Sequence, residues 1–363
     1  MLAKGSLQQH EVRNVALESG EVLPLVTTAY ATLGSLNEER SNAVLVLHGY
    51  TTGPGMLFPG SNAAEGSWSG LIGPGRAIDT ERFFAICPNM LGSSYGSTGP
   101  ASINPSTGRP YGMEFPHITL GDVVDAQCRL IDSLGIHQLA AVAGPSLGAM
   151  QAFLWATRYP ERVGRVIAAV GAPYCPEGVV DAQGLLQSLA QEPRWQNGLY
   201  KKGALAPWLT RLRLQTLERY GIEAELRSRF RDENERMREL NRIAAEWAEA
   251  FDPGSLVILA RAVEEFDVRG ELQRMRAPLL YVLSRSDEMF TPKLIDALSP
   301  LLDAAGVKWR YVELESAKGH LASGADSDLW ADTLRDFLTT PTKPTSKAGF
   351  ACNLRGRQAG KSR

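Results

Sequence analysis

The chain contains 363 residues, of which 44% are hydrophobic, and its formal net charge is -2 at pH 7. This length accommodates one large α/β domain with an insertion, or two domains. A nearly neutral charge gives no reason to expect nucleic acid or a membrane surface as a partner, and no apolar run is long enough to span a bilayer.

The amino-terminal segment and the cysteines predict a cytoplasmic location. Residues 1–14 are polar and lack the apolar core of a signal peptide. The cysteines Cys87, Cys128, Cys175 and Cys352 lie far apart and form no C-x-x-C pair. The sequence therefore predicts neither a disulfide framework nor a zinc site, and we expect no metal and no resident cofactor.

Strands dominate the first part of the chain. Residues 11–17 and 22–33 are expected to form an antiparallel pair. Residues 43–47 are an unbroken apolar run, which is typical of a strand buried on both faces. Another strand is predicted over 83–88, and the Gly/Ser/Pro-rich loop that follows it over 89–116 has a length more typical of functional loops than of plain connections.

Helices and strands then alternate to the end of the predicted core. The helices are expected at 119–134 and 328–338, and the strands at 140–144, 165–170, 277–283 and 308–314. This alternation is typical of a mostly parallel sheet covered by helices on both faces. We therefore assign residues 1–174 and 253–340 to an α/β core.

Residues 175–252 have a different character. Charged residues crowd this segment, and apolar residues recur in it at helical spacing. We predict a helical lid that covers the carboxyl edge of the sheet and forms a homodimer contact. The apolar stripe is interpreted as packing, and the alternative is that Trp195, Trp208 and Trp247 roof a pocket. Residues 341–363, which carry no acidic side chain after Pro341, are expected to be a flexible basic tail.

The pattern that organises the chain is Gly144-Pro145-Ser146-Leu147-Gly148. This G-x-S-x-G motif lies between a predicted strand and a predicted helix, which is the context that a nucleophilic serine requires. The flanking glycines allow a tight turn, and the new helix directs its first N–H groups at an anion forming on a substrate carbonyl. The alternative is a Gly-Ser turn without chemistry.

A second loop is expected to complete an oxyanion hole. His48-Gly49-Tyr50 follows the buried strand over 43–47, where hydrolases of this layout place a second donor. We assign the two donors to the backbone N–H groups of Tyr50 and Leu147. The alternative is that His48-Gly49 only turns the chain.

Two further residues give Ser146 the partners that it needs. Asp287 follows a late strand, and His320 lies in the loop after the last strand, so their order resembles the Ser, Asp, His order of α/β-hydrolases. We predict that His320 removes the Ser146 proton and that Asp287 orients the imidazole. The other histidines, and the weaker acids Asp296 and Asp303, lie in less suitable contexts.

Several sequence blocks resemble the homoserine O-acetyltransferase family. They span 71–80, 84–89 and 95–105, followed by Phe115-Pro116, Asp122 and Ala126-Gln127. The resemblance runs from about residue 17 to 173 and returns more weakly over 251–320. It implies an α/β-hydrolase core with a helical lid, often dimeric, and a catalytic triad of Ser146, Asp287 and His320.

Three positions depart from that family. Pro145 replaces the usual glycine before the serine, and Leu321 replaces an Asp that holds the homoserine amine. The lid arginine for the homoserine carboxylate aligns with about Leu209, so Arg211, two residues away, is the candidate substrate contact. Loss of one charge-assisted hydrogen bond to homoserine costs about 1.5–3 kcal/mol. Residues 319–324 look more like the corresponding residues of the esterases of this group.

These observations predict a serine carboxylesterase that acts on short-chain esters, with acetyl esters as the expected substrates, through an acyl-Ser146 intermediate. The alternative is an O-acetyltransferase that forms the same intermediate from acetyl-CoA, here a co-substrate, and passes the acyl group to an alcohol. A non-catalytic binding protein is the third hypothesis, and an intact triad disfavours it. In either catalytic case the expected partner is a small molecule.

Overall fold

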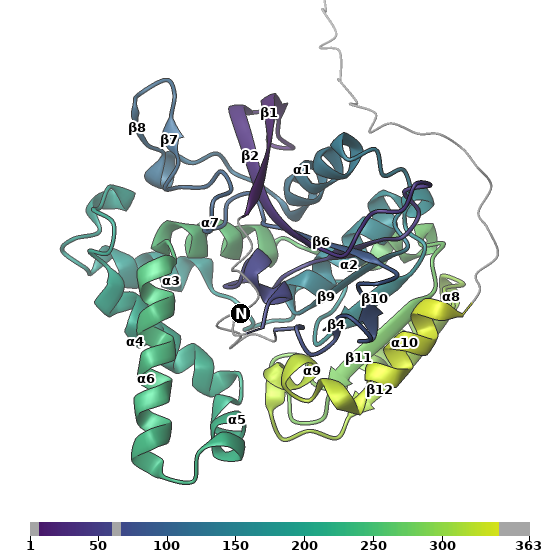
Figure 1. The fold of residues 1–363 in the computed structure, drawn as a ribbon. Helices are drawn as coiled ribbons and strands as arrows, with labels where there is room; N and C mark the ends of the chain where they lie inside the picture. The colour runs from purple at the N-terminus through teal and green to yellow at the C-terminus, as the bar shows by residue number, and fades with distance from the viewer. Residues whose placement is uncertain (1–6, 60–66, 341–363) are drawn as a thin grey trace, which may run out of the picture.

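The computed structural model describes residues 7–59 and 67–340. A sheet of eight strands forms its centre, in the order β1-β2-β6-β3-β9-β10-β11-β12 (Figure 1). The strands are β1 (Gln8–Ala16), β2 (Val22–Leu33), β3 (Ala43–Val46), β6 (Phe84–Pro88), β9 (Ala141–Pro145), β10 (Val166–Ala169), β11 (Leu279–Ser284) and β12 (Trp309–Leu314). Strands β1 and β2 pair antiparallel, and β2 also meets β6 antiparallel. From β6 to β12 every pairing is parallel.

The central strands are buried on both faces, and their side chains alternate between two apolar clusters. In β3, Leu45 packs into the cluster that also contains Val123, Met150 and Leu259, while Val44 and Val46 face the opposite cluster. This two-residue alternation follows from the pleat of a strand. Because helices or loops cover both faces, the strands need no polar side, which explains the unbroken apolar runs in the sequence.

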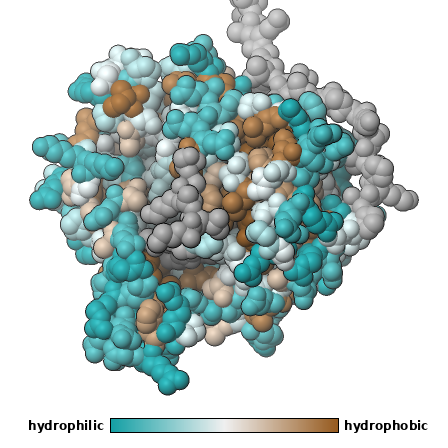
Figure 2. All heavy atoms as spheres, viewed as in Figure 1, coloured by the Kyte–Doolittle hydropathy of each residue, from teal (hydrophilic) through white to brown (hydrophobic). Residues whose placement is uncertain are grey.

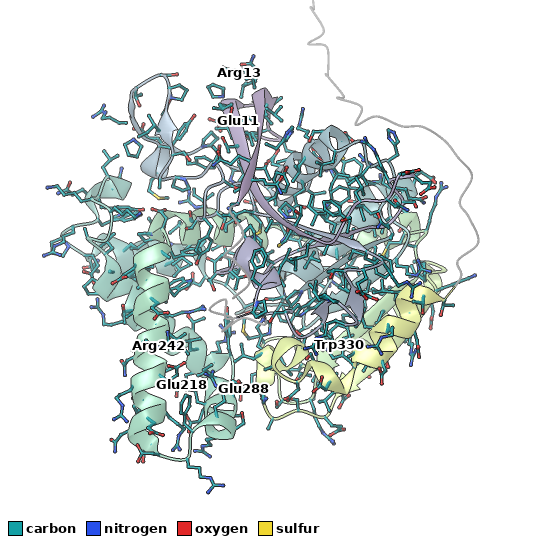
Figure 3. The ribbon with its side chains drawn as sticks, viewed as in Figure 1. Glu11, Arg13, Glu218, Arg242, Glu288 and Trp330 are labelled. Carbon is teal, nitrogen blue, oxygen red and sulfur yellow. The ribbon has the colours of Figure 1, made fainter. Side chains whose placement is uncertain are left out.

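Helices cover the two faces of the sheet. The helices of the core are α1 (Leu120–Ser133), α2 (Leu147–Arg158), α7 (Pro253–Glu264), α8 (Leu294–Ala304), α9 (Ala322–Ala325) and α10 (Ala331–Thr339). A capping box starts α1, because Thr119 and Asp122 each accept a hydrogen bond from the other's backbone N–H. On the opposite face Trp330, labelled in Figure 3, packs edge-on against Trp68 with 5.5 Å between ring centroids.

Short elements lie in the connections. They are β4 (Ile72–Gly73), β5 (Ile78–Asp79), β7 (Ile103–Asn104) and β8 (Arg109–Pro110), with single 3-10 turns between several of the longer elements. The predicted long loop over 89–116 contains the β7–β8 pair and a 3-10 turn over Gly112–Glu114.

Residues 175–252 form helices that project from the core. These are α3 (Ala182–Ala190), α4 (Ala206–Arg219), α5 (Ile222–Arg229) and α6 (Glu233–Ala250). Two apolar clusters hold them together, one around Trp208 and Trp247 and the other around Leu217 and Leu226. On the side seen in Figure 2, the surface over α5 and α6 is mostly hydrophilic, as expected for a solvated helix face.

The predicted fold class is confirmed: the sheet is mostly parallel, and helices are present on both faces. The last helix begins at Ala331 rather than at 328, because a 3-10 turn over Ser327–Leu329 precedes it. The predicted tail over 341–363 lies outside the described residues. Among the residues that the structure describes, no helix combines the length and apolarity that crossing a membrane requires.

Gly148 offers a test of how closely α2 approaches the sheet. A Cβ atom added at this position would lie 2.0 Å from the carbonyl oxygen of Leu47, at the end of β3. We expect Gly148→Ala to lower the free energy of unfolding by about 1–3 kcal/mol, because the helix or the strand end must move. Gly270→Ala is the control, since its added Cβ meets nothing within 4 Å. Equal urea unfolding curves for the two variants would contradict this prediction.

Candidate active site

Ser146 lies in a strained turn between β9 and α2. Its φ of 57° and ψ of -124° place it in a region that non-glycine residues rarely adopt. Its backbone N–H donates to the carbonyl of Ala169 on β10 at 2.9 Å, which ties the turn to the sheet. Gly144 and Gly148 flank it where added Cβ atoms would meet Leu47, so the tight turn depends on both glycines.

The structure brings the three predicted triad residues together. His320 Nε2 lies 2.8 Å from Ser146 Oγ, and His320 Nδ1 lies 2.8 Å from Asp287 Oδ2. Asp287 follows β11, and His320 follows β12, so both come from the carboxyl ends of parallel strands. Open α/β sheets commonly form their sites at this edge.

The surroundings of Asp287 favour its charged form. Its Oδ1 atom accepts hydrogen bonds from the backbone N–H groups of Met289, at 2.9 Å, and Phe290, at 3.2 Å. Burial by itself would raise the pKa of the Asp287 carboxyl, but the adjacent His320 and these N–H donors outweigh burial and hold that pKa below its usual value. A carboxylate in this state stabilises a protonated imidazole.

The imidazole of His320 is held on both sides by aromatic rings. The ring of Phe290 stacks on it with 5.6 Å between centroids, and the ring of Tyr220, from the end of α4, lies at 5.0 Å. His320 is 3% exposed. One wall of the imidazole site therefore comes from the segment over 175–252 rather than from the core.

A cavity of about 710 Å³ opens over Ser146, between the core and the helices α3, α4 and α6. This size is within the range of small-molecule sites. Charged and polar side chains share its lining with twelve apolar ones: Leu147, Met150, Val179, Val180, Leu185, Trp208, Leu212, Trp247, Leu256, Val263, Met289 and Phe290. Of the three candidate roof tryptophans, Trp208 and Trp247 line the cavity. Trp195 belongs to the same apolar cluster but does not line the cavity, and its ring stacks on Tyr200 with 5.4 Å between centroids.

Both predicted oxyanion donors lie at this cavity. Leu147 and Tyr50 line it together with Ser146. Leu147 is the first residue of α2, and the first N–H groups of a helix have no partner within the helix. The side chain of Tyr50 is anchored, because its hydroxyl donates to the carbonyl of Leu256 on α7.

The two predicted substrate contacts occupy different environments. Arg211 lines the cavity and makes an ion pair of 2.5 Å with Glu192. Leu321 follows His320 but lies in the apolar cluster with Leu217 and Leu226, outside the cavity lining. In the part of the chain that the structure describes, no group of three or more His, Cys, Asp or Glu side chains is arranged to hold a metal ion.

Arg213 is a cavity residue that the sequence analysis missed. It lies on α4 and is 1% exposed. A signal was present in the sequence, because Leu209, Arg213 and Leu217 recur every four residues and so share one buried face of the helix. An arginine within an apolar stripe is rarely buried without a specific role.

Comparisons with known proteins agree with this architecture. The family described as the alpha/beta hydrolase fold matches residues 42–323, which defines the chain as a member of that class. A homoserine O-acetyltransferase of Geobacter sulfurreducens is 35% identical over 347 residues, covering 90% of this chain and 94% of that protein. A second, from Symbiobacterium thermophilum, is 36% identical over 351 residues, covering 89% of this chain and 91% of that protein. The chain belongs to the homoserine O-acetyltransferase family.

Solved structures of both enzymatic kinds are similar to this chain. A homoserine O-acetyltransferase from Bacillus anthracis has a TM-score of 0.81 and 29% identity, covering 93% of this chain and 99% of that one. The esterase E22 has a TM-score of 0.78 and 28% identity, covering 92% of this chain and 99% of that one. The chain is thus an enzyme of the α/β-hydrolase superfamily whose relatives include both transferases and esterases.

His48 gives a prediction for the pH dependence of stability. Burial lowers the pKa of its imidazole from 6.5 to about 4, partly opposed by hydrogen bonds to Gly49 and Asn89. Between these values the unfolded chain binds a proton that the folded protein does not. The free energy of unfolding should therefore fall with decreasing pH, by up to about 1.4 kcal/mol per pH unit from this residue. When urea unfolding is measured from pH 7 to pH 5, His48→Asn should lose less free energy of unfolding than the unchanged protein. An equal loss in both would contradict a lowered pKa for His48.

Proposed function

We propose that this protein is a serine carboxylesterase for short-chain esters, with acetyl esters as its expected substrates. The observation that carries the proposal is the continuous contact from Ser146 Oγ through His320 to Asp287, with 2.8 Å at each step, in which Ser146 lines the cavity. Such an arrangement activates a hydroxyl that is otherwise a poor nucleophile.

The first half of the reaction forms an acyl-enzyme. Ser146 Oγ attacks the ester carbonyl while His320 Nε2 accepts its proton, and Asp287 stabilises the resulting imidazolium. The backbone N–H groups of Tyr50 and Leu147 donate to the oxyanion, and each such donor contributes roughly 3–4 kcal/mol to lowering the barrier. His320 then returns the proton to the departing alcohol.

The second half decides between hydrolysis and transfer. Water releases the acyl group in an esterase, whereas an alcohol acceptor receives it in a transferase. The position after His320 is Leu321, which lies in an apolar cluster and offers no carboxylate to an acceptor amine. This side chain supports water as the second substrate.

An O-acetyltransferase is the second candidate, because the curated relatives at 35% identity bear that name. In that case acetyl-CoA would be the acyl donor, and Arg211, at the cavity wall, is the candidate contact for an anionic acceptor. A small molecule is the expected partner under both candidates. A cytoplasmic location and a homodimer formed through residues 175–252 stay predictions.

Ser146→Ala tests the nucleophile. We expect it to lower hydrolysis of p-nitrophenyl acetate by at least about 10³-fold, since the covalent step is lost while the oxyanion donors remain. Ser228→Ala, at an exposed serine on α5, is the control and should keep the activity. Full activity of Ser146→Ala would mean that another residue is the nucleophile.

A comparison of acceptors separates the two candidates. We expect the enzyme to turn over p-nitrophenyl or ethyl acetate faster than it acetylates homoserine from acetyl-CoA, because Leu321 cannot form a charge-assisted hydrogen bond to the acceptor amine. Steady-state rates with each substrate set, measured on one preparation, provide the test. Faster O-acetylhomoserine formation would establish the transferase instead.

A further inference from the structure

Thr51, the residue after Tyr50, is bound by two side chains from the helices over the cavity. Arg213 Nη1, on α4, donates to Thr51 Oγ1 at 2.8 Å. Trp247 Nε1, on α6, donates to the Thr51 carbonyl oxygen at 3.0 Å. Thr51, Arg213 and Trp247 are 3%, 1% and 4% exposed, so both bonds lie in a buried environment. Hydrogen bonds of this kind are costly to break, because water does not replace the lost partner.

The two donors are also held against each other. The guanidinium carbon of Arg213 lies 4.8 Å from the centre of the Trp247 ring, which is cation–π geometry. Because the two residues come from different helices, this contact fixes how α4 and α6 approach the loop together. Arg213 and Trp247 therefore act as one clamp on Thr51.

The clamp on Thr51 lies next to one of the two proposed oxyanion donors. The Tyr50 N–H, one of the two proposed oxyanion donors, is one peptide unit away from Thr51. The Tyr50 hydroxyl is itself anchored to Leu256 on α7, so the side chain of Tyr50 and the residue after it are both held. An oxyanion donor is effective only if it already points at the position that the oxyanion will occupy.

We propose that Arg213 is a positioning residue that holds the Tyr50 N–H in the oxyanion hole by binding the Thr51 hydroxyl. This inference rests on the proposed acyl-serine chemistry and adds that the lid helices determine the shape of the hole. It also distinguishes Arg213 from a substrate-binding cation, although the residue lines the same cavity. A positioning residue changes the stability of the transition state, whereas a substrate-binding cation changes substrate affinity as well.

The test is a double-mutant cycle on Arg213 and Thr51 with p-nitrophenyl acetate as the substrate. We expect Arg213→Gln to lower kcat about tenfold to hundredfold and to change KM less than about twofold. This loss of kcat is smaller than the loss caused by deleting an oxyanion-hole donor. Thr51→Val should give a similar loss, and the double variant should lose little more than either single variant. Arg213→Lys and Thr51→Ser, which keep the donor and the hydroxyl, should recover part of kcat.

A transition-state analogue provides a second readout. A short alkyl trifluoromethyl ketone adds to Ser146 and places an oxyanion in the hole, so its inhibition constant should rise in parallel with the loss of kcat. Arg242→Gln is the matched control, since Arg242 lies on α6 (Figure 3) and pairs with Glu239 and Glu246. Arg242→Gln should leave kcat, KM and the inhibition constant of the ketone unchanged.

Specific outcomes would overturn the proposal. They are additive losses in the cycle, a rise in KM with kcat unchanged, or unchanged inhibition by the ketone. Thermal unfolding of each variant identifies a folding defect. In that case the test is whether Arg213→Lys and Thr51→Ser have a higher kcat than Arg213→Gln and Thr51→Val. Normal activity of Arg213→Gln with an inactive Ser146→Ala would remove only this inference, whereas an active Ser146→Ala would remove the proposed function.

Discussion

The close approach of the first turn of α2 to the end of β3 is the constraint on which the site depends. Gly148 lies against the carbonyl of Leu47, where any side chain would collide. This contact places Ser146 and the start of α2 beside the loop that carries Tyr50. The proposed nucleophile and the two proposed oxyanion donors therefore share one small region, although they come from separate parts of the chain.

The core and the lid helices contribute different parts of the site. The strand ends carry Ser146, Asp287 and His320, whereas the helices over the cavity supply Tyr220 against the imidazole and the clamp on Thr51. Lys318 adds a further link, because its ammonium group lies 2.8 Å from Glu225 on α5 and 2.7 Å from Asp326. The lid is thus in contact with both the base and the loop of the proposed hole, so it does more than close the cavity.

Hydrolases and transferases of this fold differ in what reaches the acyl-enzyme, not in how it forms. The proteins similar to this chain include a homoserine O-acetyltransferase and an esterase. The features that separate them are the groups that would hold an acceptor. Here Leu321 packs among apolar side chains, and Arg211 pairs with Glu192.

The amino-acid sequence by itself determined the fold class and singled out the three residues that the structure brings into contact, Ser146, Asp287 and His320. Apolar runs bounded by turns located the buried strands, and the strand–Gly-x-Ser-x-Gly–helix pattern located Ser146, because these signals are local. The order of Asp287 and His320 after late strands was also readable, since parallel strands place their carboxyl ends at one edge. Only the tertiary structure decided that Leu321 packs away from the cavity and that Arg213 reaches Thr51. Those contacts join residues more than 150 positions apart through the packing of α4 and α6 on the core, and helical periodicity predicts which face is buried but not what that face meets.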